Sequence, residues 1–312
     1  MATSLPGGRT ITSNSKPKPP LSHRIPKNSW DSHMHVVEPQ IFPLSPTAAY
    51  TPSHPHTLTQ ALTFESTLNI PNIVLVQPSI YASDNSCLLS ALHTLGPSRA
   101  RAVVGIDPRA PPSPETLKSW HTLGVRGARL NLKSVHRTLS KDELAAELRA
   151  YAAILRPLDW VLEVYIGLEL APLLVPLVPD LGVKFCIAHF GHPGLPAGSA
   201  DGEASAERDP YALQGFAALV QLLGQGRTWV KCSAAYRIEA DAEMPWTRAV
   251  GRELVRVAPG RLVFATDWPH TRFEGVDVKP FVEACLEWCG GEGEMADRLF
   301  RGNAEALWGV GE

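Results

Sequence analysis

The 312-residue sequence contains no apolar run long enough to span a membrane, and its N-terminus has no apolar segment like those of secretory signals. Charge is scarce, since only 19% of the residues are charged and the formal net charge is −2. Nucleic acids and anionic membranes select strongly basic surfaces, so this balance argues against both as the main partner. The five cysteines are too few and too scattered for a disulfide framework, and we therefore expect a reducing, cytoplasmic setting.

Acidic residues are absent from the first 27 residues, which are rich in Ser, Thr, Pro, Gly and Lys and have few large apolar side chains. Such a segment cannot bury enough surface to order itself, so we expect a loose tail over residues 1–27. Its basic character is shared by transit peptides, although its prolines oppose an amphipathic helix. Residues 28–312 are expected to form a single domain.

Short apolar strands alternate with helical segments along this domain. Strand-like segments occur near His33 and at residues 73–78, 102–106, 125–132, 160–166, 183–189, 228–233 and 261–267. A repeated strand-then-helix order predicts parallel strands joined by right-handed crossovers. We therefore predict an α/β fold, a closed (β/α)8 TIM barrel. The alternative is an open doubly wound sheet, but no Gly-rich phosphate loop follows any strand.

Two histidines stand close together in the segment 30–39, WDSHMHVVEP. Alternate side chains of a strand point the same way, so His33 and His35 are expected to share one face, together with Asp31. Polar groups on one side of an apolar strand are costly to bury without a partner. The pattern predicts a paired imidazole site for a divalent metal or an anionic substrate, and the alternative is a solvated loop with two unrelated histidines.

In a barrel of parallel strands, reactive side chains gather at the carboxyl ends of the strands. Those positions hold His33, His35, Gln77, Arg126, Arg129, Tyr165, His189, Tyr236, Arg237 and Asp267. An aspartate after an apolar strand, such as Asp267, can simply cap the next helix. Facing three imidazoles, of which His189 would be the third, it is better explained as the base that deprotonates water or as a metal ligand.

The arginines bear on the substrate. Arg126 and Arg129 are three residues apart in one strand, so they face opposite ways and at most one enters the barrel mouth. Arg237 follows another strand and can reach the same mouth. Guanidinium groups hold carboxylates through two parallel hydrogen bonds, which points to a small acidic molecule as the substrate. Surface salt bridges are the alternative for each arginine.

Four motifs occur in order between residues 29 and 308. They are Asp31-x-His33-x-His35, His189-Phe190-Gly191-His192-Pro193, Thr266-Asp267-Trp268-Pro269-His270, and Arg301-Gly302-Asn303-Ala304 with Leu307. In this order they resemble the amidohydrolase-related branch of the amidohydrolase superfamily. Within that branch the sequence is similar to the 2-pyrone-4,6-dicarboxylate lactonases and to their sugar-lactone and muconolactone hydrolase relatives. The closer likeness lies in Tyr50-Thr51-Pro52, Gln77-Pro78-Ser79, Asp84-Asn85 and Ala235-Tyr236-Arg237.

The resemblance implies a distorted (β/α)8 barrel that hydrolyses a cyclic ester. It implies that Asp267 is the general base, and that His33, His35 and His189 polarise the carbonyl group or hold a metal. The substrate-binding residues that it implies are Tyr50, Gln77, Arg129, Tyr165, Tyr236 and Arg237.

The sequence also departs from the family pattern. Many relatives have aspartate directly before the histidine of the sixth strand, where this chain has Ala188, and we expect a less firmly oriented His189 ring. No convincing metal-bridging lysine is present, which argues against a binuclear centre. Two alternatives stay open. One is a single Zn²⁺ held by His33, His35, His189 and Asp267, and the other is a metal-free pocket assisted by arginine.

We predict a hydrolase that opens a carboxylated lactone of the 2-pyrone-4,6-dicarboxylate kind with Asp267-activated water. The first alternative is a metal-dependent, non-oxidative decarboxylase of an aromatic acid, because related barrels use similar ligands. The second is a catalytically silent barrel that binds an acidic metabolite. The expected partner is a small acidic substrate rather than nucleic acid or a membrane, and a homo-oligomer stays open.

Overall fold

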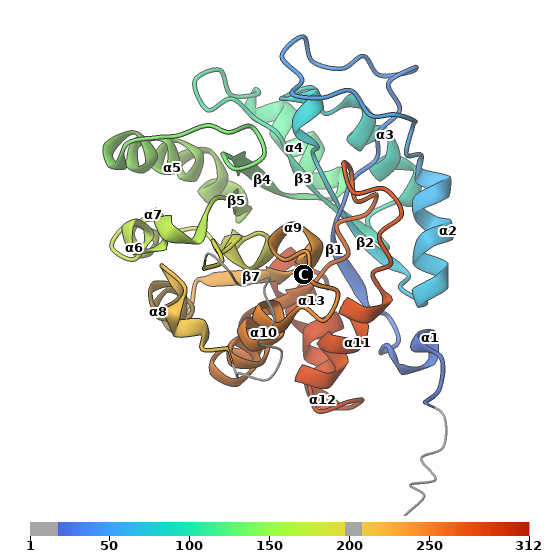
Figure 1. Cartoon of the computed structure of the whole chain (residues 1–312). Helices are drawn as coiled ribbons and strands as arrows, with labels where there is room; N and C mark the ends of the chain where they lie inside the picture. The colour runs from blue at the N-terminus through green and yellow to red at the C-terminus, as the bar shows by residue number, and fades with distance from the viewer. Residues whose placement is uncertain (1–17, 197–207, 312) are drawn as a thin grey trace, which may run out of the picture.

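The computed structural model describes residues 18–196 and 208–311, which form a barrel of eight parallel strands surrounded by helices (Figure 1). Each strand pairs with the next one in the sequence. The strands are β1 (Trp30–Met34), β2 (Asn72–Val76), β3 (Ala100–Val104), β4 (Val125–Asn131), β5 (Val161–Tyr165), β6 (Phe185–Ile187), β7 (Thr228–Cys232) and β8 (Leu262–Phe264). The predicted (β/α)8 TIM barrel is therefore confirmed. The doubly wound alternative is wrong, because its strand order would reverse at a switch point.

The barrel closes where the ends of β8 and β1 meet. Met34 forms a parallel bridge with Trp268, and the amide of His35 donates to the carbonyl of Trp268. The amide of Asp267 donates to the carbonyl of His33. This closure brings the two histidines of β1 and its end directly beside Asp267.

Asp31 faces the opposite way from the prediction. The pairing of β1 with β2 shifts register between Asp31 and Met34, and such an irregularity breaks the simple alternation of side chains. The Asp31 carboxylate accepts hydrogen bonds from the amide and the hydroxyl of Thr266, and the buried side chain of Glu65 in α2 (Leu58–Leu68) lies beside it. Burial and the neighbouring Asp31 raise the pKa of Glu65 well above its ordinary value, which favours the neutral form of Glu65. Asp31 thus stabilises the closure of the barrel and does not share a face with His33 and His35.

Helices of two kinds surround the strands. The longer ones are α2, α3 (Ser86–Leu95), α4 (Pro114–Leu123), α5 (Lys141–Leu155), α8 (Phe216–Gly224), α10 (Pro245–Val257) and α11 (Lys279–Trp288). The shorter ones are α1 (Leu21–Arg24), α6 (Ala171–Leu174), α7 (Val178–Leu181), α9 (Ala235–Ile238), α12 (Glu294–Asp297) and α13 (Asn303–Trp308). Local signals set their ends: Thr57 and Ser140 form capping boxes, Ser113 caps α4, and Gly124 ends α4 in the left-handed conformation.

Apolar side chains fill the barrel on both sides of its strands. One layer lies between strands and helices, and the other fills the interior. The interior cluster contains Trp30, Val74, Val76, Val103, Val161, Cys186, Trp229, Val263, Ala304, Leu307 and Trp308. Trp308 is fully buried, and its indole N–H donates to the Ser32 hydroxyl at 3.3 Å. Helix α13 therefore closes the amino-terminal end of the barrel.

The described chain includes residues on the amino-terminal side of the predicted boundary at Lys27. Helix α1 is part of the described structure, and the buried Arg24 donates to both carboxylate oxygens of Glu283 at 2.6 and 2.7 Å. Part of the segment that we expected to be a loose tail thus packs against the barrel through Arg24. Residues 1–17 of the predicted tail lie outside the described residues.

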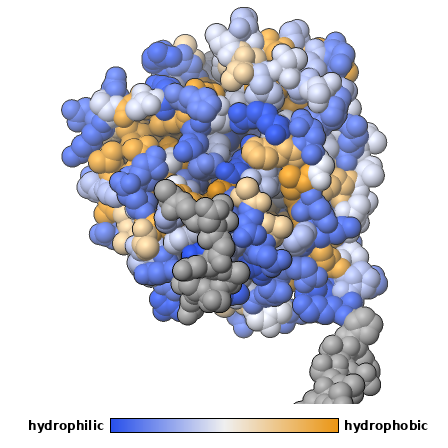
Figure 2. Space-filling view, in the orientation of Figure 1, coloured by the Kyte–Doolittle hydropathy of each residue, from blue (hydrophilic) through white to orange (hydrophobic). Residues whose placement is uncertain are grey.

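The surface drawn in Figure 2 is mostly hydrophilic, with smaller hydrophobic areas between the polar side chains. None of the helices formed by residues 18–196 and 208–311 has the length and hydropathy needed to cross a membrane.

Candidate active site

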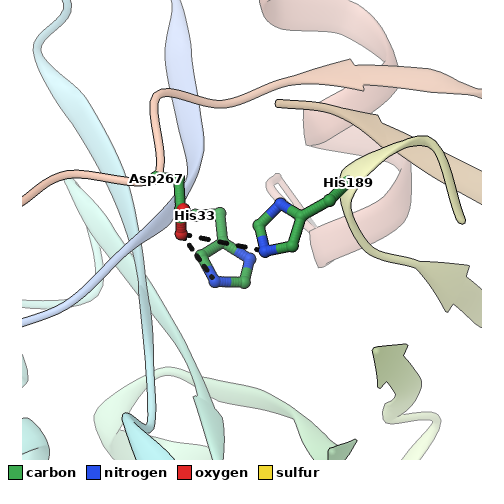
Figure 3. A group of neighbouring side chains, drawn as sticks. All are labelled: His33, His189 and Asp267. Atoms are coloured by element: carbon green, nitrogen blue, oxygen red, sulfur yellow. Dashed lines mark ion pairs between the residues drawn. The ribbon is translucent and has the colours of Figure 1, made fainter. Parts of the chain in front are cut away.

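Asp267 faces a set of imidazoles at the carboxyl end of the barrel (Figure 3). Its Oδ1 lies 3.6 Å from Nε2 of His33, 3.7 Å from Nε2 of His35 and 3.8 Å from Nε2 of His189. All four side chains are buried. His33 lies in β1, whereas His189 follows β6 and Asp267 follows β8. The predicted convergence of three imidazoles on Asp267 is therefore confirmed.

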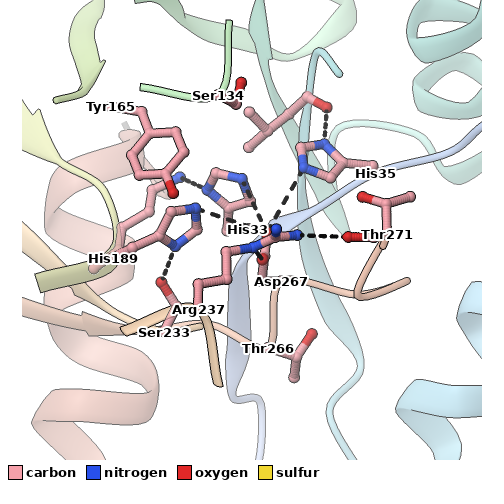
Figure 4. A network of polar contacts seen from close by, with 12 residues as sticks. His33, His35, Ser134, Tyr165, His189, Ser233, Arg237, Thr266, Asp267 and Thr271 are labelled. Atoms are coloured by element: carbon pink, nitrogen blue, oxygen red, sulfur yellow. Dashed lines mark hydrogen bonds and ion pairs between the residues drawn. The ribbon is translucent and has the colours of Figure 1, made fainter. Parts of the chain in front are cut away.

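The second oxygen of Asp267, Oδ2, accepts a hydrogen bond of 2.6 Å from the Tyr236 hydroxyl. It accepts another of 2.7 Å from Nε of Arg237 (Figure 4). Burial alone would raise the pKa of Asp267. The charge of Arg237, the neighbouring imidazoles and the Tyr236 hydrogen bond outweigh burial and hold this pKa well below its ordinary value. Asp267 is therefore ionised and held in one orientation.

Both His189 and Asp267 sit where the chain turns sharply after a strand. Their φ angles are +55° and +64°, in the left-handed region that residues other than glycine rarely adopt. Such conformations persist only where the surrounding structure holds them, and they cluster at functional sites.

The imidazoles of His35 and His189 are fixed at their other nitrogen by different partners (Figure 4). Nδ1 of His35 lies 2.8 Å from the carbonyl oxygen of Val76, which can only accept, so Nδ1 carries the proton and Nε2 a lone pair. Nδ1 of His189 lies 2.8 Å from the Ser233 hydroxyl. The looseness that we expected from Ala188 is therefore wrong, because Ser233 orients the His189 ring instead.

A buried charged pair lies behind His33. Nζ of Lys231 in β7 is 2.5 Å from Oε2 of Glu163 in β5 and 3.2 Å from Nδ1 of His33. Oε1 of Glu163 is 3.6 Å from Nδ1 of His33 and 3.6 Å from Nε of Arg129. Sequence reasoning missed this pair, although a charged residue inside each of two short apolar strands was an available signal.

A small polar cavity opens in front of Asp267. Four of the predicted substrate-binding residues line it, namely Tyr50, Arg129, Tyr165 and Arg237. Sequence reasoning did not single out Ser134, Thr271 and Arg272, which line it as well. Thr271 and Arg272 directly follow the Thr266–His270 motif, so their position in the sequence was a usable signal.

The other two predicted substrate-binding side chains do not line this cavity. Nε2 of Gln77 donates to main-chain carbonyls of Ala82 and Asp84 at 3.3 and 2.7 Å, so it holds the loop after β2. Tyr236 donates to Asp267, so its hydroxyl orients the carboxylate.

Alternation along β4 separates the two arginines of that strand, as predicted. Arg129 is buried at the barrel mouth, where Nη1 donates to the Gln77 carbonyl at 3.1 Å. Nη1 of Arg126 donates to two main-chain carbonyls at 2.7 and 2.9 Å, and Arg126 does not line the cavity. The cavity thus combines Arg129, Arg237 and Arg272, a set of guanidinium groups that suits carboxylates.

Burial keeps the three imidazoles neutral. It lowers the pKa of His35 to about 4 and holds the pKa values of His33 and His189 well below the ordinary value. Burial also raises the pKa of Tyr165. Near neutral pH the site therefore contains one carboxylate, neutral imidazoles and several guanidinium groups.

The spacing of these groups is short enough for a metal site, since ligand atoms of His33, His189 and Asp267 lie within 4.8 Å of one another. A metal needs the lone pair of a neutral imidazole nitrogen. The ammonium group of Lys231 can only donate, so Nδ1 of His33 accepts and the ring proton sits on Nε2, the nitrogen nearest Asp267. In this arrangement His33 does not fit as a metal ligand.

The family model described as Amidohydrolase matches residues 30–310. The chain belongs to the amidohydrolase family. This amidohydrolase is 28% identical over 298 residues to the 4-sulfomuconolactone hydrolase of Hydrogenophaga intermedia, a match that covers 93% of this chain and 91% of the relative. It is 27% identical over 259 residues to the 2-pyrone-4,6-dicarboxylate hydrolase of Comamonas testosteroni, with coverage of 79% and 78%.

A solved structure of a candidate 2-pyrone-4,6-dicarboxylic acid hydrolase from Pseudomonas putida is also similar to this amidohydrolase. The two share 29% identity and a TM-score of 0.74 over 91% of this chain and 98% of the other. The resemblance found in the sequence is therefore confirmed, and the chain is a hydrolase of this family.

Proposed function

We propose that this amidohydrolase opens a lactone that carries carboxylate groups, by attack of water on the ring ester carbonyl. The observation that carries the proposal is the buried, ionised Asp267, which faces three imidazoles beside a cavity containing three arginines. The names of the curated relatives, a sulfomuconolactone hydrolase and a pyrone dicarboxylate hydrolase, support this substrate class.

In the proposed step, Oδ1 of Asp267 accepts a proton from water while the water oxygen bonds to the lactone carbonyl carbon. The distances of 3.6 to 3.8 Å between Oδ1 and the imidazoles are too long for direct hydrogen bonds, which favours a bridging water or substrate oxygen. The ring C–O bond then breaks, and the leaving oxygen takes the proton held by Asp267. One water is consumed, and one carboxyl and one hydroxyl group are formed.

Two of the imidazoles have different roles in this scheme. The Nδ1–H group of His35 donates to the Val76 carbonyl, so the lone pair on Nε2 can accept a hydrogen bond from the attacking water. His33 presents an N–H at Nε2, which can donate to the developing oxyanion. Removal of one oxyanion donor typically costs about 10²- to 10³-fold in kcat.

Arg237 links substrate binding to the strength of the base. Its Nε donates to Asp267, and Nη2 donates to the Thr271 carbonyl at 3.2 Å. A substrate carboxylate beside Arg237 offsets the positive charge and raises the pKa of Asp267 toward its ordinary value. The base then strengthens only when an acidic substrate is bound, which favours carboxylated over neutral lactones.

The test is a panel of carboxylated lactones, each paired with its uncharged methyl ester or amide. The purified protein should release acid from the carboxylated members, with kcat/KM at least about 10-fold higher than for the uncharged partners, as one lost charge-assisted contact predicts. A pH-stat measures acid release. Release of CO₂ would indicate decarboxylation instead, and binding without turnover across the panel would indicate a silent barrel.

Replacing the base gives the most direct check. Asp267→Asn should lower kcat by about 10²- to 10⁴-fold while the far-ultraviolet circular dichroism stays unchanged, since the amide cannot take the proton. Asp142→Asn, at an exposed position in the first turn of α5, is the matched control and should keep full activity. A fully active Asp267→Asn enzyme would remove Asp267 as the base.

A further inference from the structure

Lys231 is a fully buried lysine whose Nζ has two hydrogen-bond partners and one aromatic neighbour. Its Nζ lies 2.5 Å from Oε2 of Glu163, 3.2 Å from Nδ1 of His33 and 5.1 Å from the centre of the Trp308 ring. An ammonium group has three donors and no acceptor, and an aromatic face attracts its charge. The His33 nitrogen that faces Lys231 must therefore accept.

We propose that Lys231 is a positioning residue that keeps the His33 proton on Nε2, so that His33 donates to the reacting carbonyl oxygen and cannot bind zinc. A neutral imidazole has one ring proton, and placing it on Nε2 removes the lone pair that a metal needs. Among the described residues, Nε2 of His33 is buried without a hydrogen-bond partner, as expected for a donor that awaits a substrate oxygen.

Glu163 would favour the opposite tautomer of His33, with the ring proton on Nδ1. Its Oε1 is buried, has no hydrogen-bond partner among residues 18–196 and 208–311, and lies 3.6 Å from Nδ1 of His33. Without Lys231, this carboxylate is an acceptor for a proton on Nδ1. His33 would then donate from Nδ1 and turn a lone pair at Nε2 toward Asp267 and His189. Zinc-binding histidines commonly have such a carboxylate at their other nitrogen.

Lys231 thus selects between two states of one ring: a donor for a substrate oxygen and a ligand for a metal. The choice of tautomer and the exclusion of zinc stand independently of the substrate. The role of His33 as a carbonyl donor rests on the proposed lactone hydrolysis.

The first experiment is a zinc titration of chelator-treated protein by calorimetry. Lys231→Met should bind Zn²⁺ at least about 10-fold more tightly than the wild type, the scale on which outer partners of ligating histidines act. Adding His33→Asn to Lys231→Met should remove the gain. Lys184→Met is the matched control, because Nζ of Lys184 pairs with Asp159 at 2.9 Å away from the cavity, and it should leave zinc binding unchanged.

Two outcomes would overturn the proposal: equal zinc affinity of the wild type and Lys231→Met, or a gain that survives His33→Asn. A second measurement needs no lysine variant and therefore holds even if Lys231→Met fails to fold. Nitrogen NMR of ¹⁵N-histidine-labelled wild-type protein, with the His33 signals assigned by their loss in His33→Asn, should report a proton on Nε2. A proton on Nδ1 would contradict the proposal.

Failure of this proposal and failure of the proposed function can be told apart. Absence of lactone hydrolysis would leave the zinc and NMR results unchanged. Hydrolysis together with a His33 proton on Nδ1 would leave the proposed function intact and reject the role of Lys231.

Discussion

Among single residues, Asp267 shows how the site is held. Tyr236 and Arg237 fix one carboxylate oxygen, while the imidazoles face the other. His189 is held in the same way, since its Nδ1 is hydrogen-bonded to the Ser233 hydroxyl while its Nε2 faces Asp267. Each reactive side chain therefore has one atom bound to a supporting group and one atom directed into the site, which is the preorganisation that catalysis by charge stabilisation requires.

The burial of His35 gives a pH dependence of stability. Its pKa is lowered from 6.5 to about 4 in the folded chain, so between these values the unfolded chain binds a proton that the folded chain does not. The free energy of unfolding should therefore fall as the pH drops from 6.5 to 4. Urea unfolding across this range should show a weaker pH dependence in His35→Gln than in the wild type.

His192 and His270, whose pKa values are also lowered to about 4, act in the same direction, so His35→Gln should keep part of the dependence. His93→Gln, at an exposed position of α3, is the control and should retain the full wild-type dependence. If the free energy of unfolding changed equally with pH in His35→Gln and the wild type, the contribution of His35 to this dependence would be contradicted.

Among the elements, β1 and β8 form the seam of the barrel. Their ends share a few main-chain hydrogen bonds, and side chains complete the junction. Asp31 accepts hydrogen bonds from the amide and the hydroxyl of Thr266. Since Asp267 is the next residue after Thr266, the seam also sets where the base lies.

Removing the Thr266 hydroxyl should weaken this seam. Thr266→Val deletes the hydrogen bond to Asp31 and the acceptor of the Trp268 amide at 3.1 Å, so we expect a loss of about 1–3 kcal/mol in the free energy of unfolding. Thr228→Val is the matched control, because the buried Thr228 hydroxyl has no partner in the part of the chain that is described. Urea unfolding should show a much smaller change there, and similar losses in both variants would refute the role of the seam.

In the molecule as a whole, the two ends of the barrel have separate tasks. Helix α13 closes the amino-terminal end, while the reactive groups lie at the carboxyl end, where this fold places active sites. Lys231 links the two ends, since its Nζ lies over the Trp308 ring, 5.1 Å from the ring centre, and 3.2 Å from Nδ1 of His33. Packing at the closed end therefore supports the position of a group in the site.

The packing of α13 against the amino-terminal end of the barrel should contribute much of the free energy of unfolding. Trp308→Ala removes a fully buried ring and should cost about 3–5 kcal/mol in the free energy of unfolding, measured with urea. Trp120→Ala on α4, where the ring is half-buried, is the control and should cost clearly less. Equal costs at the two positions would mean that α13 contributes little to the barrel.

Local patterns were sufficient for most of the elements. The start of α2 follows from the capping box of Thr57 and Gln60, and the start and end of α4 follow from Ser113 and Gly124. Caps and apolar periods act over a few neighbouring residues, so a sequence displays them directly. The least accurate boundary was that of the tail, because the salt bridge between Arg24 and Glu283 spans 259 positions.

The sequence by itself determined the order of strands, the residue types at their carboxyl ends and the family, because these depend on spacing along the chain. Only the tertiary structure decided which way Asp31, Gln77 and Tyr236 point, and that Lys231 and Glu163 stand behind His33. The reason is physical: a strand irregularity reverses a face, and a hydrogen bond is decided by a few tenths of an ångström between atoms from distant strands.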